Sequence, residues 1–551
     1  MKKLYAGVIA STLLVNLQAQ SFSWANRAGL WAYDYGYGIT TDNTGNVYVA
    51  GKYEMNADFS GITLPCQGNH DIYLAKYTAS GAIDWVQTGG GTLGDYAHAL
   101  ATDGSNYIYV AGEIEGYGNQ IVFPGSSITL NSVGNNDAFL CKYDINGNLL
   151  WARSAGAYKN DKALGVTYDN AGNIFICGLF TDTCIFGGNT MVLGHGAEEI
   201  FVAKYDANGN FQWVQSAGSP QRDEPKGIKC DAAGNVYVCG FYSNGAVFGL
   251  QTLTAPNNYF ESFVAKYSNS GVLQWVSTGG GNYDDVAWDL ELDNSASRIY
   301  VAGEFNASAN FGSTQLITHG NADVYVACYD FSGNTIWATG AGGTLIDRAR
   351  GMGSNGNNLY ITGQFGSSAT FGGHTLNAAD SSDIFFVSLD KSGNFLGALA
   401  VGGQADSVET LGYESGIDIC ATAAGDVFAT GAMLDGGTFG STTLGKYART
   451  DMFITRISQL TNVNEYAAGQ PAAPVYPNPG NGNFIIQPSY DINERTETIV
   501  YNSLGSIVSK RTDDSFTRMN IDLSGSESGV YFLEIKSGGR EVVREKLLIQ
   551  R

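Results

Sequence analysis

One unit recurs seven times between about residue 21 and residue 458 of this 551-residue chain. Its clearest segment reads Gly-Asn-Val-Tyr-Val-Ala-Gly at residues 45–51. A repeat of this length, built from short strands and turns, predicts radial repetition of four-stranded sheets. The glycines that close this segment in the seven copies lie 60 to 68 residues apart, at Gly51, Gly112, Gly178, Gly240, Gly303, Gly363 and Gly431.

The second copy shows how one unit is built. Residues 95–103 and 107–112 alternate between small and large side chains and predict two strands, and residues 137–143 predict a third. A short Gly- and Ser-containing excursion, residues 121–130, lies between the second and third strands. Asn146-Gly147 predicts a hairpin turn, because both residues tolerate positive φ, and a fourth strand starts at residues 149–151.

A tryptophan marks the fourth strand of most copies, and its placement suggests how the repeat ends. Trp24 precedes the first full copy, whereas the last copy stops at its third strand, residues 452–457. We therefore expect the N-terminal strand, around residues 22–25, to pair with residues 452–457 and to leave no open edge. The fold predicted is an all-β, seven-bladed β-propeller closed by the N-terminal strand. The fourth-strand tryptophans are Trp85, Trp151, Trp213, Trp275 and Trp337.

The unit resembles the bacterial β-propeller repeats that are named for seven-bladed propellers. The resemblance covers about residues 21–458, and it rests on the segment at 45–51, on the acidic residue that leads the first strand, and on Asp-Ile-Tyr-Leu-Ala-Lys-Tyr at 71–77. It implies a fold and no particular activity, because one fold hosts many functions.

The composition changes after residue 458. A polar linker at 459–473 leads to residues 474–551, where six or seven β-like stretches predict a small Ig-like antiparallel sandwich. Tyr-Pro-Asn-Pro at 476–479, Tyr-Asn-Ser-Leu-Gly at 501–505 and Gly-Val-Tyr-Phe-Leu at 529–533 resemble the type A C-terminal sorting domain of type IX secretion. The resemblance implies the type IX machinery as a partner and a destination outside the cell or on its outer surface.

The N-terminus has the pattern of a signal peptide. Lys2 and Lys3 precede an apolar run at 8–17, and Ala19 predicts removal of residues 1–19 and a propeller that starts at residue 20. The run is too short to span a membrane, and no later stretch approaches the required ~20 apolar residues.

The formal net charge of −22 falls almost wholly on the repeats, since residues 474–551 hold 9 Lys and Arg against 10 Asp and Glu. This acidic balance argues against nucleic acid as a partner. It suits divalent cations or neutral glycans better.

The eight cysteines form no disulfide framework. Cys177 and Cys184 flank one short turn and are the best candidate for a disulfide; the alternative is that the cysteines are buried thiols. The five histidines do not cluster as zinc ligands would.

Two positions are acidic in every copy. Either they form an acidic rim that binds Ca²⁺, the cofactor that the sequence suggests, or each carboxylate accepts backbone N–H bonds and fixes a loop. Sevenfold repetition favours the loop-fixing role, because a site for one ligand should break the symmetry. The first acidic position leads the first strand, at Asp34, Asp95, Asp161, Asp223, Asp285, Asp347 and Glu414. The second leads the third strand, at Asp71, Asp137, Glu199, Glu261, Asp323, Asp383 and Asp451.

The position three residues after the first acid differs from copy to copy. Its neighbours are mostly Gly or Ala, so its seven side chains are expected to converge near the mouth of the channel. Tyr and Trp can stack on a sugar ring, and Lys and Arg can bind a carboxylate; the alternative is packing between blades. The position holds Leu164, Ile417 and five candidate ligand-binding residues, Tyr37, His98, Lys226, Trp288 and Arg350.

Catalysis has less support in the sequence. Glycoside cleavage needs two carboxylates at a set separation, and the asymmetric acids are Asp289 and Asp418, which replace the Gly or Ala of other copies. The sequence favours a non-catalytic adhesion protein, secreted or on the cell surface, whose propeller binds a glycan or a protein. The alternative is an extracellular enzyme, a glycoside hydrolase or lyase, with its site at the channel mouth.

Overall fold

The computed structural model describes residues 21–30, 32–379, 381–403, 414–434, 436–445, 449–458, 460, 475–477, 480–486, 495–502, 507–514, 518–537 and 540–550. The chain divides into two compact units, residues 1–463 and 464–551. The predicted signal peptide lies outside the described residues, as does the predicted linker apart from Leu460.

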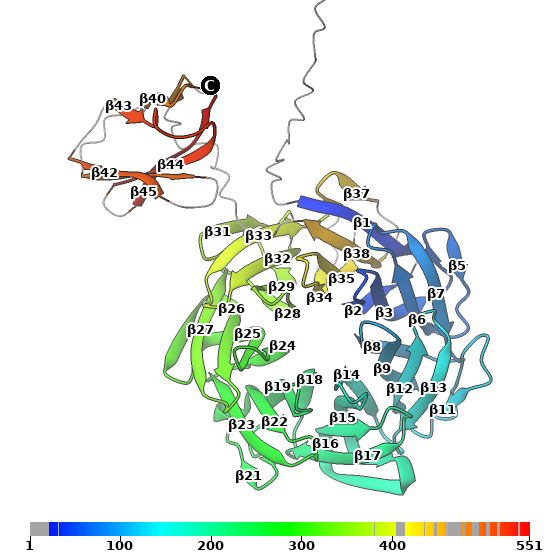
Figure 1. Ribbon diagram of the computed structural model, residues 1–551. Helices are drawn as coiled ribbons and strands as arrows, with labels where there is room; N and C mark the ends of the chain where they lie inside the picture. Colours follow the sequence, from blue (N-terminus) through cyan, green and yellow to red (C-terminus); the bar gives the residue numbers. More distant parts are fainter. Residues whose placement is uncertain are drawn as a thin grey trace, which may run out of the picture. The chain divides into compact units, whose positions relative to one another are not determined.

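The first unit contains seven groups of four antiparallel strands, which Figure 1 shows arranged around one centre. We name the groups sheet 1 to sheet 7 in chain order and give the strands of each from the centre outward. Sheet 1 is β2 (Tyr35–Thr41), β3 (Val47–Glu54), β6 (His70–Tyr77) and β7 (Ile83–Gly89); sheet 2 is β8 (Asp95–Thr102), β9 (Tyr107–Glu115), β12 (Asn136–Asp144) and β13 (Leu149–Ala155); sheet 3 is β14 (Asp161–Tyr168), β15 (Ile174–Phe186), β16 (Thr190–Tyr205) and β17 (Phe211–Gly218).

The remaining four sheets repeat this order. Sheet 4 is β18 (Glu224–Cys230), β19 (Val236–Tyr242), β22 (Glu261–Tyr267) and β23 (Leu273–Gly281); sheet 5 is β24 (Val286–Asp293), β25 (Arg298–Phe311), β26 (Thr314–Asp330) and β27 (Thr335–Gly343); sheet 6 is β28 (Arg348–Ser354), β29 (Asn358–Phe365), β32 (Asp383–Asp390) and β33 (Phe395–Val401); sheet 7 is β34 (Ser415–Ala421), β35 (Val427–Met433), β38 (Asp451–Ser458) and β1 (Ser21–Gly29).

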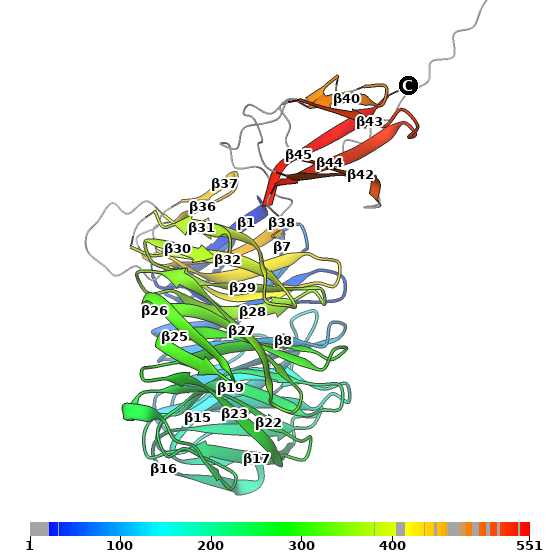
Figure 2. The same cartoon turned by 90° about the vertical axis from the view of Figure 1, so that its left-hand side faces the viewer.

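Neighbouring sheets pack face to face, as the side view of Figure 2 shows for sheets 3 to 6. The innermost strand of each sheet contacts that of the next, and β34 of the last sheet contacts β2 of the first. Second strands such as β3 are buried on both faces, because a sheet packs on either side of them. The core is accordingly divided into clusters that lie between sheets; one joins Tyr109 and Ala111 of sheet 2 to Ile176 and Phe201 of sheet 3.

The N-terminal strand makes the expected pairing with β38. It runs antiparallel to β38, with Phe22 opposite Ile457 and Trp24 opposite Arg456. Trp24 also behaves as the fourth-strand tryptophan of its sheet, since its indole Nε1 donates a hydrogen bond of 3.1 Å to the Ala79 carbonyl in sheet 1. The equivalent Trp151 of sheet 2 packs its ring against Gly209 (φ +76°) of sheet 3, where a Cβ atom would come within 2.9 Å of the indole.

The excursion between the second and third strands is a β-hairpin that reaches the preceding sheet. Strands β4 (Ala57–Phe59), β20 (Val247–Phe248) and β30 (Ser368–Phe371) and the end of β25 each pair with the outermost strand of the preceding sheet. Backbone hydrogen bonds between Gly90 and Val122, and between Gly156 and Ile185, make the same connection. The other hairpin elements are β5 (Ile62–Leu64), β10 (Gln120–Val122), β11 (Thr129–Asn131), η1 (Gly187–Asn189), β21 (Gln251–Thr252), η2 (Pro256–Asn258), β31 (His374–Asn377), β36 (Gly437–Phe439) and β37 (Thr442–Leu444).

The suggested disulfide between Cys177 and Cys184 is wrong. Both thiols are free and buried, and they belong to different core clusters on either side of sheet 3. The other six cysteines are free as well, and Cys141, Cys239 and Cys328 are buried. They act as small apolar side chains in the packing between sheets.

The second unit contains two antiparallel sheets that share one core. Side chains from both sheets, among them Phe484, Ile521, Val500 and Leu533, form this core. One sheet has the order β39 (Val475–Tyr476), β40 (Asn483–Ile486), β43 (Met519–Asp522), and the other has the order β42 (Ile507–Asp513), β41 (Thr496–Asn502), β44 (Gly529–Ser537), β45 (Arg540–Ile549).

Candidate functional site

A β-bulge interrupts the innermost strand of every sheet at the same point. In sheet 1 the register of β2 against β3 shifts between Gly36 and Gly38, so Tyr37 is the extra residue. A bulge leaves one residue unpaired and redirects its side chain. The bulged residues are the seven that the sequence singled out as variable: Tyr37, His98, Leu164, Lys226, Trp288, Arg350 and Ile417.

All seven bulged side chains line one cavity of about 400 Å³. Each is partly exposed, and the residue before it on its strand is buried. The volume falls within the ~300–1,000 Å³ typical of small-molecule sites. We call this space the channel-mouth cavity. The structure therefore brings together every residue of the variable position, and their role in binding stays a prediction.

One part of the cavity wall is aromatic. The rings of Tyr35 and Tyr37 stack with centroids 5.6 Å apart and planes 5° from parallel, and Tyr37 lies 5.6 Å from the His98 ring. His98 Nε2 lies 2.9 Å from Glu113 Oε1 in sheet 2, and Lys162 also pairs with Glu113 at 3.0 Å. Burial alone would raise the pKa of Glu113, but the bond from His98 and the charge of Lys162 lower it to about 2.

The opposite part of the wall is cationic. Trp288 lies between two cations: Lys226 Nζ is 4.4 Å and Arg350 Cζ is 4.0 Å from its ring centroid. The indole Nε1 donates to Glu304 at 3.3 Å, which fixes the plane of the ring. Cation–π contacts of this kind strengthen when the groups are desolvated. Leu164 and Ile417 separate the cationic part from the aromatic part.

Asp289 and Asp418 also line the cavity, deeper along the same strands. Both oxygens of Asp418 accept backbone bonds of 2.8 Å, from Ile419 of its own strand and from Ile39 of sheet 1. Asp289 in the same way accepts from Leu290 at 2.8 Å and from Met352 of sheet 6 at 2.9 Å. Each carboxylate therefore connects two innermost strands, a structural role that its position alone did not indicate.

Burial raises the pKa of both carboxyls, and the nearby Lys229 ammonium opposes the rise. Lys229 itself forms an ion pair with Glu291 at 3.0 Å. The two catalytic candidates thus have similar surroundings, with the same Lys229 nearby. Their pKa shifts have the same direction and the same kinds of cause, so neither residue is marked as the acid, the base or the nucleophile.

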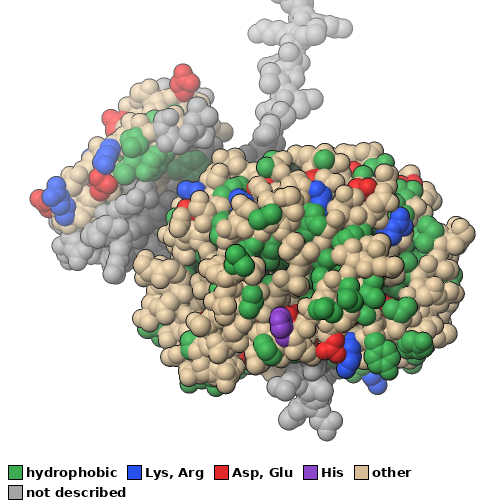
Figure 3. All heavy atoms as spheres, turned by 90° about the horizontal axis from the view of Figure 1, so that it is seen from below, with side chains coloured by type: hydrophobic (Ala, Val, Ile, Leu, Met, Phe, Trp, Pro, Cys, Tyr) green, Lys and Arg blue, Asp and Glu red, His purple; other side chains and the backbone are tan. Residues whose placement is uncertain are grey.

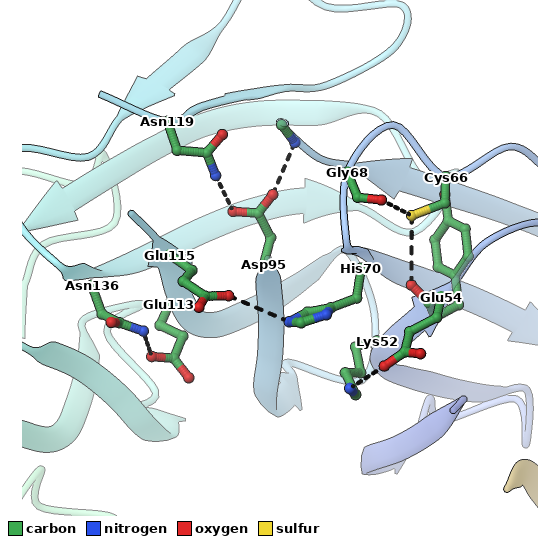
Figure 4. A network of polar contacts seen from close by, with 12 residues as sticks. Lys52, Glu54, Cys66, Gly68, His70, Asp95, Glu113, Glu115, Asn119 and Asn136 are labelled. Atoms are coloured by element: carbon green, nitrogen blue, oxygen red, sulfur yellow. Dashed lines mark hydrogen bonds and ion pairs between the residues drawn. The ribbon is translucent and has the colours of Figure 1, made fainter. Parts of the chain in front are cut away.

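The carboxylates of both invariant acidic positions are buried. Asp347 shows the pattern of the first position: it accepts backbone N–H bonds from Gly343 at 2.7 Å and from Gly366 at 3.0 Å. Figure 4 shows Asp95, which accepts from Asn119 at 3.3 Å and from the Gly91 N–H at 2.9 Å. In the second position, Asp323 accepts from the His319 N–H at 2.9 Å.

The two acidic positions meet where one sheet adjoins the next. Gly342 lies between Asp323 of sheet 5 and Asp347 of sheet 6, and a Cβ atom there would come within 2.6 and 2.9 Å of their oxygens. Among the described residues, no group of three or more His, Cys, Asp or Glu side chains is arranged to hold a metal ion. These contacts agree with loop fixing, and they give the Ca²⁺ interpretation no ligand set.

The sequence contained no clear sign of the bulges. The alternation of small and large residues predicted that the variable side chains converge on the channel. It did so for a regular strand, in which every second side chain points inward, and it did not predict the extra residue that each strand contains. The small residues on either side of the variable position were the available signal.

Comparison with known proteins gives two family matches. Residues 474–550 match the secretion system C-terminal sorting domain, and residues 24–52 match the β-propeller repeat family SBBP. The chain joins an SBBP propeller repeat to a type IX sorting domain. The sorting domain directs this propeller-repeat protein through type IX secretion to the cell surface or the surroundings. Within the described part of the chain, no helix has the length and apolar character needed to cross a membrane.

Two curated proteins are similar over part of the propeller-repeat protein. An uncharacterized WD repeat-containing protein of Acanthamoeba polyphaga mimivirus is 27% identical over 230 residues, which cover 35% of this chain and 16% of the relative. The regulatory protein FlaEY of Caulobacter vibrioides is 25% identical over 190 residues, which cover 33% and 20%. The chain therefore spans a fifth or less of the length of these relatives.

Solved structures resemble the propeller-repeat protein only distantly. The quinohemoprotein alcohol dehydrogenase of Comamonas testosteroni has a TM-score of 0.34 and 9% identity, over 81% of this chain and 79% of that one. A structural genomics protein of Bacteroides thetaiotaomicron has a TM-score of 0.28 and 11% identity, over 77% of this chain and 100% of that one.

Proposed function

We propose that the exported protein is a non-catalytic binding protein whose channel-mouth cavity takes an extracellular glycan, and that adhesion is its role at the cell surface. The architecture that goes with this proposal is a seven-bladed propeller, closed by β1 and followed by an Ig-like sorting domain. The pairing of β1 with β38 and the contact of β34 with β2 support the closure.

The observation that carries the proposal is the convergence of seven non-equivalent bulged side chains on one cavity. Equivalent positions of a repeat serve the fold when they stay constant and are available for a ligand when they differ. Tyr37 and Trp288 offer aromatic surface to a sugar ring, and Lys226 and Arg350, which flank the Trp288 ring, offer donors for its oxygens.

A protein ligand on the outer side of the unit has less support. On the face drawn in Figure 3, acidic and basic side chains lie scattered among hydrophobic and neutral ones, without a patch of one charge. The enzyme alternative rests on Asp289 and Asp418, whose oxygens are already engaged by backbone N–H groups.

Binding of the purified full chain to a panel of extracellular polysaccharides, read for both retention and released products, tests the proposal. We expect retention without products, and at least tenfold weaker retention for Trp288→Ala. Tyr117→Ala, an exposed aromatic residue away from the cavity, is the matched control and should bind normally. Released products would support the enzyme alternative, and equal binding by Trp288→Ala would remove the channel-mouth cavity from consideration.

A further inference from the structure

A second cavity adjoins the channel-mouth cavity and shares three wall residues with it: Glu224, Lys226 and Trp288. Its volume is about 530 Å³. We call it the outer cavity. Its remaining wall comes from sheets 4, 5 and 6 and the loops between them, and includes Arg222, Phe241, Phe260, Asn306 and Arg348. The two volumes together, about 400 and 530 Å³, leave room for more than one sugar unit.

The outer cavity has an aromatic wall of its own. Phe241 and Phe260 lie with ring centroids 4.6 Å apart, and Arg222 lies 5.6 Å from the Phe241 ring. Lys226 connects the two cavities, since its Nζ lies 5.7 Å from Phe241 and 4.4 Å from Trp288. Cations therefore lie against aromatic rings from the outer cavity to the channel-mouth cavity.

Most charges on this path are paired. Arg222 bonds Glu198 at 2.7 Å and Glu224 at 2.6 Å, and Lys226 also pairs with Glu224. Arg348 pairs with Glu304. Asp284, which lines the outer cavity together with Glu224 and Glu304, accepts a 2.9 Å bond from the Phe260 N–H.

Arg350 differs from the other cations along this path because it has no acidic partner among the described residues. Its Nε atom is buried without a hydrogen-bond partner, and no described residue forms an ion pair with its guanidinium, which lies against Trp288. Burial lowers the pKa of Arg350 to about 10, so the group is still charged at neutral pH. A buried N–H donor without an acceptor is costly, and a ligand in the cavity can supply an acceptor to this partly exposed guanidinium. Its planar fork suits the two oxygens of a carboxylate.

We infer that the ligand is an acidic oligosaccharide, with a carboxylate bound to Arg350 in the channel-mouth cavity, beside the shared residue Trp288, and with the sugar chain continuing into the outer cavity. This inference rests on the proposed function and adds two properties of the ligand to it, a carboxylate and a length of more than one sugar.

Titration calorimetry on the full chain tests both properties. The probes are oligomers of one to six residues from polygalacturonate, alginate and hyaluronate, each with its carboxyl-reduced, neutral counterpart. We expect affinity for one acidic series to rise with length over the first few residues, and to fall at least tenfold when its carboxyl groups are reduced.

Two variants separate the two properties. Arg350→Met should bind acidic and reduced oligomers equally, whereas Arg298→Met, at a partly exposed arginine that lines neither cavity, should still prefer the acidic form. Phe260→Ala should weaken binding of the longer oligomers and leave the single sugar unchanged. A preference that survives Arg350→Met, or affinity independent of length, would overturn the inference while the proposed function stands. Failure of every glycan to bind would overturn both.

Discussion

The first invariant acidic position lies three residues before the bulged position in every copy, yet the two positions differ in variability and in exposure. The acid is present in every sheet, is buried, and accepts bonds from its own loop. The bulged residue changes from Tyr to Lys to Trp around the ring and is partly exposed to one shared cavity. Seven equivalent loops share the same anchor, whereas the proposed binding of one asymmetric ligand would need contacts that differ from sheet to sheet.

The same contrast exists between tryptophans. Trp275 is a fourth-strand tryptophan of the constant kind: its Nε1 donates to the Phe331 carbonyl at 3.1 Å, and its ring packs against Gly333 of the next sheet. Trp288 lies thirteen positions later and lines the cavity. The bulged position of every other sheet holds a different residue type. Residue type alone therefore does not distinguish a tryptophan packed between sheets from one that lines the cavity; its position within the repeat does.

Trp275→Ala and Trp288→Ala form the matched pair that tests this contrast most strongly. Trp275→Ala should lower the free energy of unfolding by about 3 kcal/mol, because it removes a large ring from between two sheets. Trp288→Ala should change stability by less than about 1 kcal/mol, since it faces a cavity. Urea denaturation measures both. Equal losses would show that Trp288 is also a packing residue.

The second prediction concerns the anchor itself. Asp347→Ala leaves the N–H groups of Gly343 and Gly366 without their acceptor and should cost about 2–3 kcal/mol, given about 1–3 kcal/mol for an unsatisfied buried group. Denaturation of this variant beside Arg350→Met, three residues along the same strand, gives the comparison. We expect the loss only in the first variant; a comparable loss in Arg350→Met would mean that the bulge also supports the fold.

The buried acids predict an unusual pH dependence. Burial raises the pKa of Asp34, Asp285 and Asp347 to about 7 and that of Asp95 and Asp161 to about 8. In the unfolded chain these groups ionise near pH 4. Between about pH 4 and pH 8 the folded protein therefore holds more protons than the unfolded one, so stability falls as the pH rises.

Thermal unfolding across this range measures the slope. Glu113, whose pKa is about 2, acts in the opposite direction: its contribution is present above about pH 4.5 and is lost on further acidification. We therefore expect the highest melting temperature in mildly acidic solution. Asp95→Asn should make the decline above pH 5 shallower. A melting temperature that rises from pH 5 to pH 8 would contradict the assignment of buried, protonated acids.

Much of the architecture could be predicted from the sequence because the same strand and turn pattern occurs in seven copies. Asn146-Gly147 and its equivalents fixed the hairpins, and the surplus Trp24 predicted the pairing of the first strand with the last. The hairpins that pair with the preceding sheet were not predicted, because residues 121–130 show no alternation that distinguishes a short hairpin from a loop.

The sequence predicted which variable residues line the cavity, but it did not predict how their side chains are arranged. The variable position identified Trp288 and Arg350 as neighbours in a ring, but neither the bulge nor the sandwich of Trp288 between two cations follows from spacing. The hydrogen bonds that Asp289 and Asp418 accept from the next sheet could not be predicted from the sequence either. They depend on how closely the innermost strands approach one another, which tertiary packing decides.

The smallest of these stability effects is expected at Asp418, a residue that connects two strands and is also one of the two catalytic candidates. Asp418→Asn keeps one acceptor oxygen for two N–H donors, Ile39 of the first sheet and Ile419 of its own strand, so it should cost about 1 kcal/mol. Asp289→Asn is its counterpart between sheets 5 and 6 and should cost the same. If instead stability is unchanged and a polysaccharide-cleaving activity of the wild type disappears, the deep carboxylates belong to an active site, because a strand-connecting role predicts a change in stability and none in turnover.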